Sequence, residues 1–387
     1  MTSYNLSKYA IGFALSLGLC SGALAQSGTI KIGVNEPLTG AVAASGSMVT
    51  AGVRLAAEDI NAKGGVLGKK LELIIEDNKS NPTEAAAVAE KLLSSDKVPA
   101  MIGAWSSTYT LAVMPKLMEY KVPMIVETSS ADKITLSGNP YVFRISPTNG
   151  SEAKSFARFV EPMNIKKVDF LVVNNDWGLG AVAEFTKMFQ SKGVKVNQSL
   201  RMDASARDLS AQLSTIKGTD SDALFVTTGS DQIALVMKQA QALGLQRRII
   251  TTGGSNLPDQ LIAQAGSAAN NSYHDLMFAP WFPDTAPDPV AAKNFIAAWK
   301  KAGLPEEGLP EGGRGYDAVY VLARAIEKAG AAEPEKIRAA LWELEYPGLT
   351  SKIKFEKVGP AGKESGQSFG STHLIGIVDG KITLADK

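Results

Sequence analysis

The sequence predicts an α/β protein made of two similar lobes, each with a parallel sheet packed between helices. Segments of β type alternate with helical segments of about 10–15 residues, as in right-handed βαβ units. The alternation runs from residue 29 to residue 145 and then starts again. The chain, with 387 residues, also exceeds the roughly 250–300 residues at which chains usually divide into domains.

The first lobe follows from the order of its elements. A strand is expected at 29–34 (TIKIGV), then an amphipathic helix at 46–61 and a strand at 70–77 (KLELIIED). The alternation continues with a helix at 82–94, strands at 100–103, 124–126 and 141–145, and a helix at 111–120.

The second lobe begins where the pattern restarts, with a helix at 151–163 and a buried-type strand at 167–174 (KVDFLVVN). The proline-rich segment 277–289 predicts a crossing between the lobes rather than a helix. The other expected elements are 180–192, 195–201, 209–216, 223–227, 233–243, 249–252 and 257–265, helices at 289–301, 316–329 and 335–344, and strands at 349–355, 373–378 and 382–384, the last two around an Asp379-Gly380 turn.

The late helices are expected to return to the first lobe, which has too few helices of its own to cover its sheet. We therefore assign 26–146 and 280–349 to lobe 1, and 147–279 and 350–387 to lobe 2. Several chain crossings between the lobes form a hinge, and two lobes joined by a hinge have a cleft between them. Because open α/β sheets bind ligands beyond the carboxyl ends of their strands, the cleft between these Rossmann-like lobes is the expected site.

The N-terminus predicts export. Lys8 precedes an apolar run at 9–19, and Ala23-Leu24-Ala25 gives small residues at −3 and −1, so 1–25 is expected to be a signal peptide cleaved before Gln26. The run is too short to span a bilayer, which needs about 20 apolar residues. The expected location is the periplasm. The alternative is a lipoprotein anchored at Cys20, although the preceding Leu19 is large for that signal.

Composition disfavours several other functions. Of 40 basic and 39 acidic residues, removal of Lys8 leaves 39 of each, with no basic block for nucleic acid. A catalytic triad would have to use His274 or His373, which are better explained as structural or surface residues. The acidic pairs at 58–59 and 76–77 lack the spacing of a calcium loop. We expect no enzymatic activity, no metal and no cofactor.

A glycine pattern at 178–183 (GLGAVA) resembles a dinucleotide fingerprint, G-x-G-x-x-A. That fingerprint places its first glycine tightly against the strand end, whereas Asn175-Asp176-Trp177 intervene here. The glycines are better explained as a helix start lying close to a cleft.

Two polar loops follow successive strands of the first lobe. The segment 103–108 contains Ser106 and Ser107, and the segment 127–131 contains Thr128, Ser129 and Ser130. Hydroxyls and free N–H groups at a helix N-terminus form an anion site. The alternative for each loop alone is ordinary helix capping. Two such loops on neighbouring strands favour the anion site.

Several segments resemble the periplasmic binding proteins for branched-chain amino acids. They are 32–40 (IGVNEPLTG), 52–68 (GVRLAAEDINAKGGVLG), 77–82 (DNKSNP), 177–180 (WGLG), 240–245 (AQALGL), 316–318 (YDA) and 325–330 (AIEKAG). The resemblance covers nearly the whole chain after the signal peptide. It implies a type I fold with three lobe crossings, near 146–147, 278–280 and 349–351.

The resemblance also implies a ligand site. The family's carboxylate clamp falls on the hydroxyls of Ser107, Thr128 and Ser130, with backbone N–H groups of Ser107 and Ser130. Trp105 and Trp177 fall where the family places side chains against the ligand body. Ser45 and Ser230 fall at further positions that line the pocket.

The second lobe departs from the family pattern. The acid that pairs with an amino-acid ammonium would fall near Gly253-Gly254, which carry no charge. Because an unpaired buried ammonium costs several kcal/mol, an aromatic or other apolar carboxylate stacked on indole is the expected ligand. Asp231, on a neighbouring loop, could supply the missing charge and restore an amino-acid ligand.

The expected function is that of a monomeric receptor for an ABC-type importer, which captures a small carboxylate by lobe closure and delivers it to permease subunits. A sensory ligand-binding domain acting on a separate receptor is the main alternative. An exported oxidoreductase or hydrolase is the remaining one.

Overall fold

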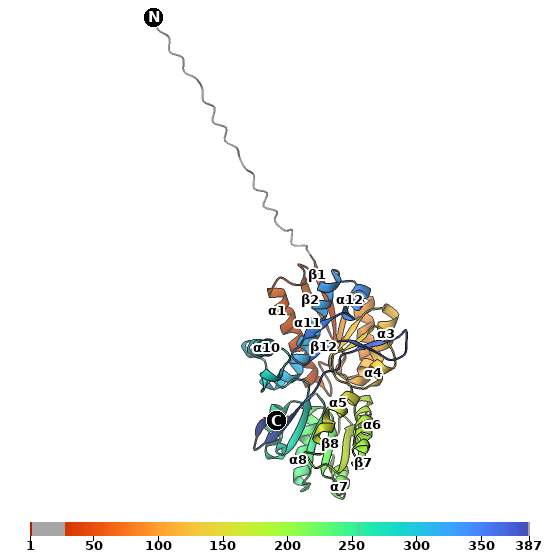
Figure 1. Cartoon of the computed structure of the whole chain (residues 1–387), viewed down its shortest axis with the longest axis vertical. Coiled ribbons are helices and arrows are strands. Elements are labelled where there is room, and N and C mark those ends of the chain that lie inside the picture. The colour runs from red at the N-terminus through yellow and green to blue at the C-terminus, as the bar shows by residue number, and fades with distance from the viewer. Residues whose placement is uncertain (2–27, 255, 386–387) are drawn as a thin grey trace.

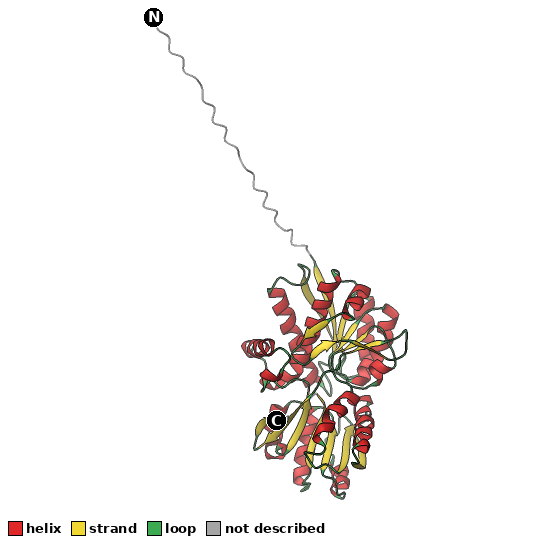
Figure 2. Ribbon diagram, viewed as in Figure 1, coloured by secondary structure: helices red, strands yellow, loops and turns green. Residues whose placement is uncertain are grey.

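The computed structural model describes residues 1, 28–254 and 256–385. Apart from Met1, the expected signal peptide with Cys20 lies outside the described residues. Two lobes lie one above the other along the long axis of the molecule (Figure 1). Each lobe is a sheet packed between helices (Figure 2), as the alternating pattern predicts.

The upper lobe in Figure 1 contains a sheet with the strand order β13-β14-β5-β4-β3-β1-β2. All its pairings are parallel except the one between β13 and β14. Parallel strands covered on both faces are continuously apolar, which explains the buried runs of β3, β4 and β5. The strands are β1 (Thr29–Glu36), β2 (Lys70–Asp77), β3 (Met101–Gly103), β4 (Met124–Val126), β5 (Val142–Arg144), β13 (Glu356–Val358) and β14 (Ser365–Gln367).

Helices from both ends of the chain cover this sheet. Buried side chains of α1 (Ala43–Ala62), α11 (Leu309–Ala329) and α12 (Pro334–Leu341) form one core. Those of α2 (Pro82–Ser94), α3 (Ser107–Tyr120) and α4 (Lys133–Leu136) form another. The late helices α11 and α12 therefore return to the first lobe, as expected. With α10 (Pro289–Lys301), α11 also builds a smaller core around Trp299.

The lower lobe repeats this plan in the order β16-β15-β10-β9-β8-β6-β7. Its first five strands in the chain pair in parallel, and β15 and β16 add an antiparallel edge. One core involves α7 (Ser210–Lys217), α8 (Ser230–Ala242) and α9 (Pro258–Ala265), and the other α5 (Asn149–Phe156) and α6 (Asp176–Ser191). The strands are β6 (Lys167–Val173), β7 (Lys195–Met202), β8 (Ala223–Thr227), β9 (Arg248–Gly254), β10 (Ser272–Leu276), β15 (His373–Val378) and β16 (Lys381–Leu384).

The chain crosses between the sheets after β5, after β10 and after β14. The first two crossings lie at the expected places, near 146–147 and 278–280. The third does not, because β14 pairs with β5 in the first sheet. The boundary at 349/350 was therefore wrong: the segment 352–367 stays with the first lobe, where β12 (Lys352–Lys354) pairs with β11 (Glu345–Pro347). The crossing follows Gln367.

A hydrogen bond and an ion pair of one residue, Asp176, join the lobes at one edge of the cleft. Asp176, at the start of α6, bonds through its carboxylate to the Thr108 hydroxyl of α3 at 2.9 Å. Its other carboxylate oxygen pairs with Lys133 of α4 at 2.6 Å. The two lobes are therefore in contact across the cleft in this structure.

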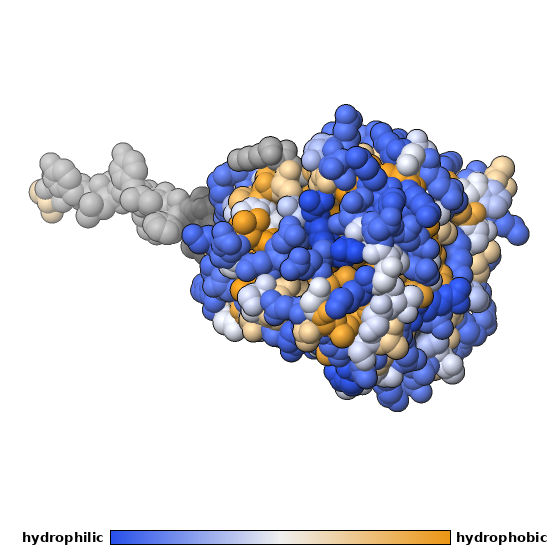
Figure 3. Space-filling view, turned by 90° about the horizontal axis from the view of Figure 1, so that it is seen from below, coloured by the Kyte–Doolittle hydropathy of each residue, from blue (hydrophilic) through white to orange (hydrophobic). Residues whose placement is uncertain are grey.

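No helix in the described part of the chain is both long enough and apolar enough to cross a bilayer. Figure 3, which views the molecule from below, shows hydrophilic side chains over most of that face, with apolar ones in small groups. Scattered apolar residues of this kind are ordinary on protein surfaces.

Candidate functional site

A cavity of about 380 Å³ lies between the lobes. Its walls are loops that follow β1 and β3 in the first lobe and β6, β7 and β8 in the second. These are the carboxyl ends of parallel strands, where the fold is expected to bind ligands. The lining residues are Gly40, Ala41, Val42, Ala44, Ser45, Trp105, Ser106, Tyr109, Val173, Asn175, Trp177, Ala204, Ser205, Ala206, Arg207, Thr228, Gly229, Ser230, Asp231, Gln232, Leu235 and Gln260.

A second, inner space of about 10 Å³ is lined by three residues of the outer cavity, by the polar loop after β4, and by Ser107 and Gly253. Its volume is about that of one water molecule. Eight predicted site residues surround it: Trp105, Ser106, Ser107, Thr128, Ser129, Ser130, Trp177 and Gly253. The other three, Ser45, Ser230 and Asp231, line the outer cavity. Both lobes therefore contribute residues to the predicted set.

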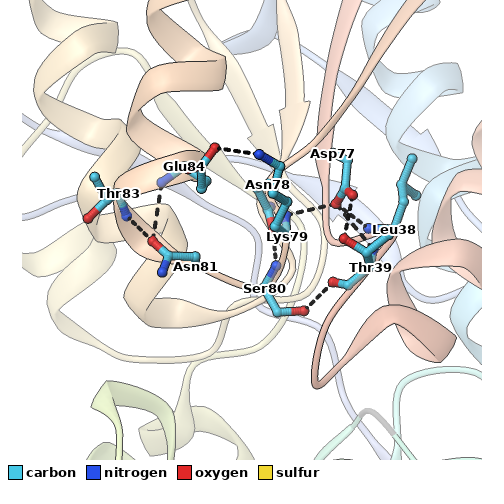
Figure 4. A network of polar contacts seen from close by, with 9 residues as sticks. All are labelled: Leu38, Thr39, Asp77, Asn78, Lys79, Ser80, Asn81, Thr83 and Glu84. Carbon is cyan, nitrogen blue, oxygen red and sulfur yellow. Dashed lines mark hydrogen bonds and ion pairs between the residues drawn. The ribbon is translucent and has the colours of Figure 1, made fainter.

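A network of polar contacts joins the loop after β1 to the loop after β2 in the first lobe (Figure 4). The Asp77 carboxylate accepts the N–H groups of Leu38, Thr39 and Lys79. The Ser80 hydroxyl donates to the Thr39 carbonyl at 2.7 Å. Since Gly40, Ala41 and Val42 follow directly and line the cavity, this network fixes one wall of the site.

The start of α3 provides unused donors. Ser106 precedes the helix, and its buried hydroxyl has no hydrogen-bond partner among the described residues. The Ser107 hydroxyl accepts the N–H of Ala131 at 3.1 Å, which joins the two polar loops. The first N–H groups of a helix lack intrahelical acceptors and attract anions. Ser106 therefore adds a free hydroxyl to an anion-attracting helix end.

The hydroxyls of the loop after β4 bond to protein groups around the inner space. The Ser130 hydroxyl donates to the Asn149 side chain at 2.9 Å, and the Thr128 hydroxyl lies 3.4 Å from an Arg314 nitrogen. The Ser129 hydroxyl donates to the Trp105 carbonyl at 2.8 Å. Ser129 thus ties the two loops together and has a structural role beside the predicted binding one.

Two buried indoles cover the inner space. The rings of Trp105 and Trp177 meet edge to face, with centroids 5.8 Å apart. A Cβ atom on Gly253 would lie 2.3 Å from the Trp177 ring. The position near which an amino-acid binder would offer its acid is therefore filled by indole, and only glycine leaves room for it. The buried Trp177 indole nitrogen has no acceptor among the described residues.

Asp231 and Ser230 are already hydrogen-bonded. The exposed Asp231 carboxylate accepts from the side-chain amides of Gln260 and Gln264 at 2.7 and 3.0 Å. The Ser230 hydroxyl accepts the Leu257 N–H at 3.1 Å. An ammonium group at Asp231 would have to displace or share these amides.

A buried acidic cluster, which sequence reasoning missed, lies next to the loop after β4. Glu36, Glu127 and Glu311 are fully buried beside Arg314, which contacts Glu311 at 3.1 Å. Burial, reinforced by Glu127, raises the pKa of Glu36 well above its ordinary value. Burial also raises the pKa of Glu127 to about 7. Because these residues come from three distant segments, no local spacing in the sequence indicates the cluster.

Glu152 extends the cluster to the second lobe. Its carboxylate accepts the Gly253 N–H at 2.5 Å, and burial raises its pKa to about 7. It lines neither the inner space nor the outer cavity.

The residues on which the disfavoured enzymatic and dinucleotide alternatives depend have structural surroundings. His274 is fully buried between Thr251 and Ser272, and burial lowers its pKa to about 3. The glycines of 178–183 pack closely, since a Cβ on Gly178 would lie 2.1 Å from the Val173 carbonyl oxygen. One G-x-S-x-G spacing, 366–370, lies at the end of β14 and on the following crossing, not on a strand-to-helix turn, and its Ser368 is buried.

Comparison with known proteins identifies the family. A family model described as "Periplasmic binding protein" matches residues 29–363. The leucine-, isoleucine-, valine-, threonine- and alanine-binding protein of Pseudomonas aeruginosa is 30% identical over 335 residues, which cover 86% of this chain and 87% of that protein.

Two solved structures extend the comparison. The leucine binding protein LivK of Thermotoga maritima is 30% identical, with a TM-score of 0.81 over 92% of this chain and 97% of its own. A solute binding protein of an ABC transporter from Rhodopseudomonas palustris, solved with 3,4-dihydroxybenzoic acid, is 25% identical, with a TM-score of 0.79 over 92% of this chain and 95% of its own.

These similarities agree with the two sheets, the crossings and the cavity between the lobes. The family consists of solute-binding proteins and not of enzymes, which agrees with the expectation of no catalysis. The chain belongs to the periplasmic binding proteins, as a type I member of the branched-chain amino acid family.

Proposed function

We propose that this chain is the extracytoplasmic receptor of an ABC-type importer and captures a small apolar carboxylate, aromatic acids first among them. The carboxylate binds at the α3 N-terminus, to Ser106, Ser107, Thr128 and Ser130. The apolar body lies against Trp105 and Trp177. The outer cavity, about 380 Å³, falls within the range of about 300–1,000 Å³ that is usual for small-ligand sites.

The observation that carries this proposal is the packing of Trp177 on Gly253. It removes the room for an acid that would pair with an ammonium, and it places an aromatic surface there instead. The neighbouring Glu152 bonds to the Gly253 backbone and lines neither space. A ligand with a carboxylate and no ammonium leaves no buried cation unpaired.

An α-amino acid is the second candidate. The similarity to the leucine-binding proteins, at 30% identity, favours it. Such a ligand would direct its ammonium to Asp231, whose carboxylate lines the outer cavity. Export through an N-terminal signal peptide and delivery to a permease belong to both candidates.

The test is a thermal-shift and calorimetric screen of the mature protein with benzoate, 3,4-dihydroxybenzoate, L-leucine and L-isoleucine. Ligand at about 100 times its Kd adds about 2.7 kcal/mol of stability. Because the inner space is so small, a bound carboxylate moves the indoles, and tryptophan fluorescence should change. The paired variant Ser107→Ala/Ser130→Ala should weaken carboxylate binding by about tenfold or more, and Ser191→Ala, which lies at the far end of α6, should not.

Stabilisation by leucine or isoleucine without any by the benzoates would reject the aromatic-acid proposal in favour of the amino acid. Delivery to an importer is tested separately, by uptake of the bound compound in cells with and without the gene. Unchanged uptake would favour a sensory role.

A further inference from the structure

The arginine behind the polar loop after β4 is buried without an acid bonded to it. Arg144, at the end of β5, is fully buried. Its Nη1 donates to the carbonyls of Ser129 and Ala131, at 3.1 and 2.7 Å. Its Nη2 donates to the Thr135 hydroxyl at 2.7 Å. All of these acceptors are neutral, and no carboxylate in 28–254 or 256–385 forms an ion pair with Arg144.

The second buried arginine provides a contrast. Arg314 also reaches the loop, through Thr128, but it is paired with Glu311 at 3.1 Å. Removing an arginine from water without a counter-charge is costly. Burial accordingly lowers the pKa of Arg144 to about 9, an effect that the nearby Asp132 charge opposes. Arg144 therefore leaves a positive charge in the loop that this chain does not neutralise by direct contact.

The hydrogen bond from Arg144 to the Ser129 carbonyl polarises the peptide group that joins Ser129 to Ser130. The carbonyl of Ser129 and the N–H of Ser130 belong to one planar peptide group. A charged donor on the carbonyl oxygen withdraws electron density and makes the N–H on the other side a stronger donor, because hydrogen bonds in a chain polarise one another. The Ser146 hydroxyl donates to the same carbonyl at 3.2 Å. The peptide between Ser129 and Ser130 is thus polarised from behind.

Gln367 fixes the arginine in this orientation. Its side-chain oxygen accepts from Arg144 Nε at 2.6 Å. Its nitrogen donates to the carbonyls of Ser146 and Ser368, at 2.9 and 2.7 Å. These two carbonyls lie on the first and third crossings. The guanidinium is therefore held by both loop and hinge, and it cannot turn away without breaking several buried bonds.

We propose that Arg144 is a positioning residue whose buried charge, transmitted through the peptide group of Ser129 and Ser130, strengthens the binding of an anionic head group. The inference rests on the proposed function, because it takes the carboxylate to lie at Ser130. The ligand's negative charge then acts on Arg144 in addition to that of the nearby Asp132, which forms no direct ion pair with it. Arg144 touches the loop and not the ligand.

The test compares a variant that places a carboxylate against Arg144 with a variant that places a neutral amide of the same shape there. Thr135→Asp brings an acid to Nη2, and Thr135→Asn brings an amide of the same shape. Affinity for benzoate and for L-leucine is measured by calorimetry for wild type and both variants. Thr135→Asp should bind the carboxylate more weakly than Thr135→Asn, on the order of tenfold, because one buried charge has been cancelled. A purely structural Arg144 would give equal affinities.

A second pair of variants tests the proposal if the Thr135→Asp variant does not fold. Arg144→Lys keeps the charge and Arg144→Gln removes it. The lysine variant should retain more carboxylate affinity than the glutamine variant, again by about tenfold. Equal affinities within either folded pair overturn the role of Arg144 and leave the proposed function intact. If wild type binds neither benzoate nor leucine, the proposed function fails, and this inference fails with it.

Discussion

At the scale of single residues, Gly253 decides the shape of the second-lobe wall. It combines a φ of +93° with a ring atom of Trp177 only 2.3 Å from where a Cβ would stand. A positive φ strains any residue with a side chain, and the ring adds a steric clash. The residue therefore accounts for both the position of the indole and the absence of an acid.

Gly253→Ala should destabilise the protein by about 1–3 kcal/mol through strain and overpacking, and it should also abolish or strongly weaken ligand binding because Trp177 is displaced. Thermal unfolding and ligand titration measure the two effects. The matched control is Gly244→Ala, which has a φ of +65° but nothing within 4 Å of its added Cβ. Normal binding by Gly253→Ala would show that the ring can move without consequence for the site.

At the scale of elements, the start of α6 faces the first lobe. Asn175 caps the helix by accepting the Gly178 N–H at 3.1 Å, which leaves the Asp176 carboxylate free to contact α3 and α4. Thr108 and Lys133 are thus joined to the second lobe through one residue. These bonds exist only while the lobes are together, so they contribute to the closed state alone.

Asp176→Asn should weaken ligand affinity by about two- to fivefold, because a partly exposed ion pair and its hydrogen bond contribute roughly 0.2–1 kcal/mol. The loss should lie mainly in faster dissociation, which stopped-flow tryptophan fluorescence measures. Lys187→Ala is the control, since it breaks an ion pair within α6, at 2.6 Å to Glu184, that does not cross the cleft. Equal dissociation rates for the two variants would mean that these bonds do not hold the lobes closed.

At the scale of the whole molecule, the buried acidic cluster makes stability depend on pH. Glu127 faces Glu36 of β1 and Arg314 of α11, which pairs with Glu311. Its pKa of about 7 lies above its ordinary value, so the folded protein holds a proton there that the unfolded chain releases. Between the ordinary pKa and about 7, stability therefore falls as the pH rises.

Replacing Glu127 with glutamine removes this proton uptake. Relative to wild type, Glu127→Gln should gain stability between pH 5 and pH 8, by at most a few kcal/mol, because each pKa unit corresponds to about 1.4 kcal/mol. Urea unfolding at the two pH values gives the difference. Glu327→Gln, an exposed position at the end of α11, is the control. A constant difference between Glu127→Gln and wild type would place the Glu127 pKa near its ordinary value.

The sequence predicted most of the fold, because strand and helix periodicities are local properties. The two parallel sheets, the return of α11 and α12 and the family were all confirmed. The placement of β13 and β14 was wrong because two short strands at a sheet edge carry no pattern that names their neighbour. Pairing with β5 is a property of the assembled lobe.

The site was predicted less completely. The eleven predicted residues all line the inner space or the outer cavity, while their roles in binding remain predictions. Arg144 and the acidic cluster were missed because their partners come from distant segments. A charged residue inside the otherwise apolar strand YVFRI, at 141–145, was the one available signal for Arg144. A buried charge in a strand requires partners, and the sequence does not show which ones.

The order of the strands has a consequence for how this protein is made. The first sheet needs β14, and the second needs β15, to fill positions beside β5 and β10, which emerge far earlier. Each sheet therefore has an unpaired edge strand until the segment that pairs with it has been synthesised. Such pairing of distant segments slows folding, so neither sheet is complete until the C-terminal segment has been synthesised.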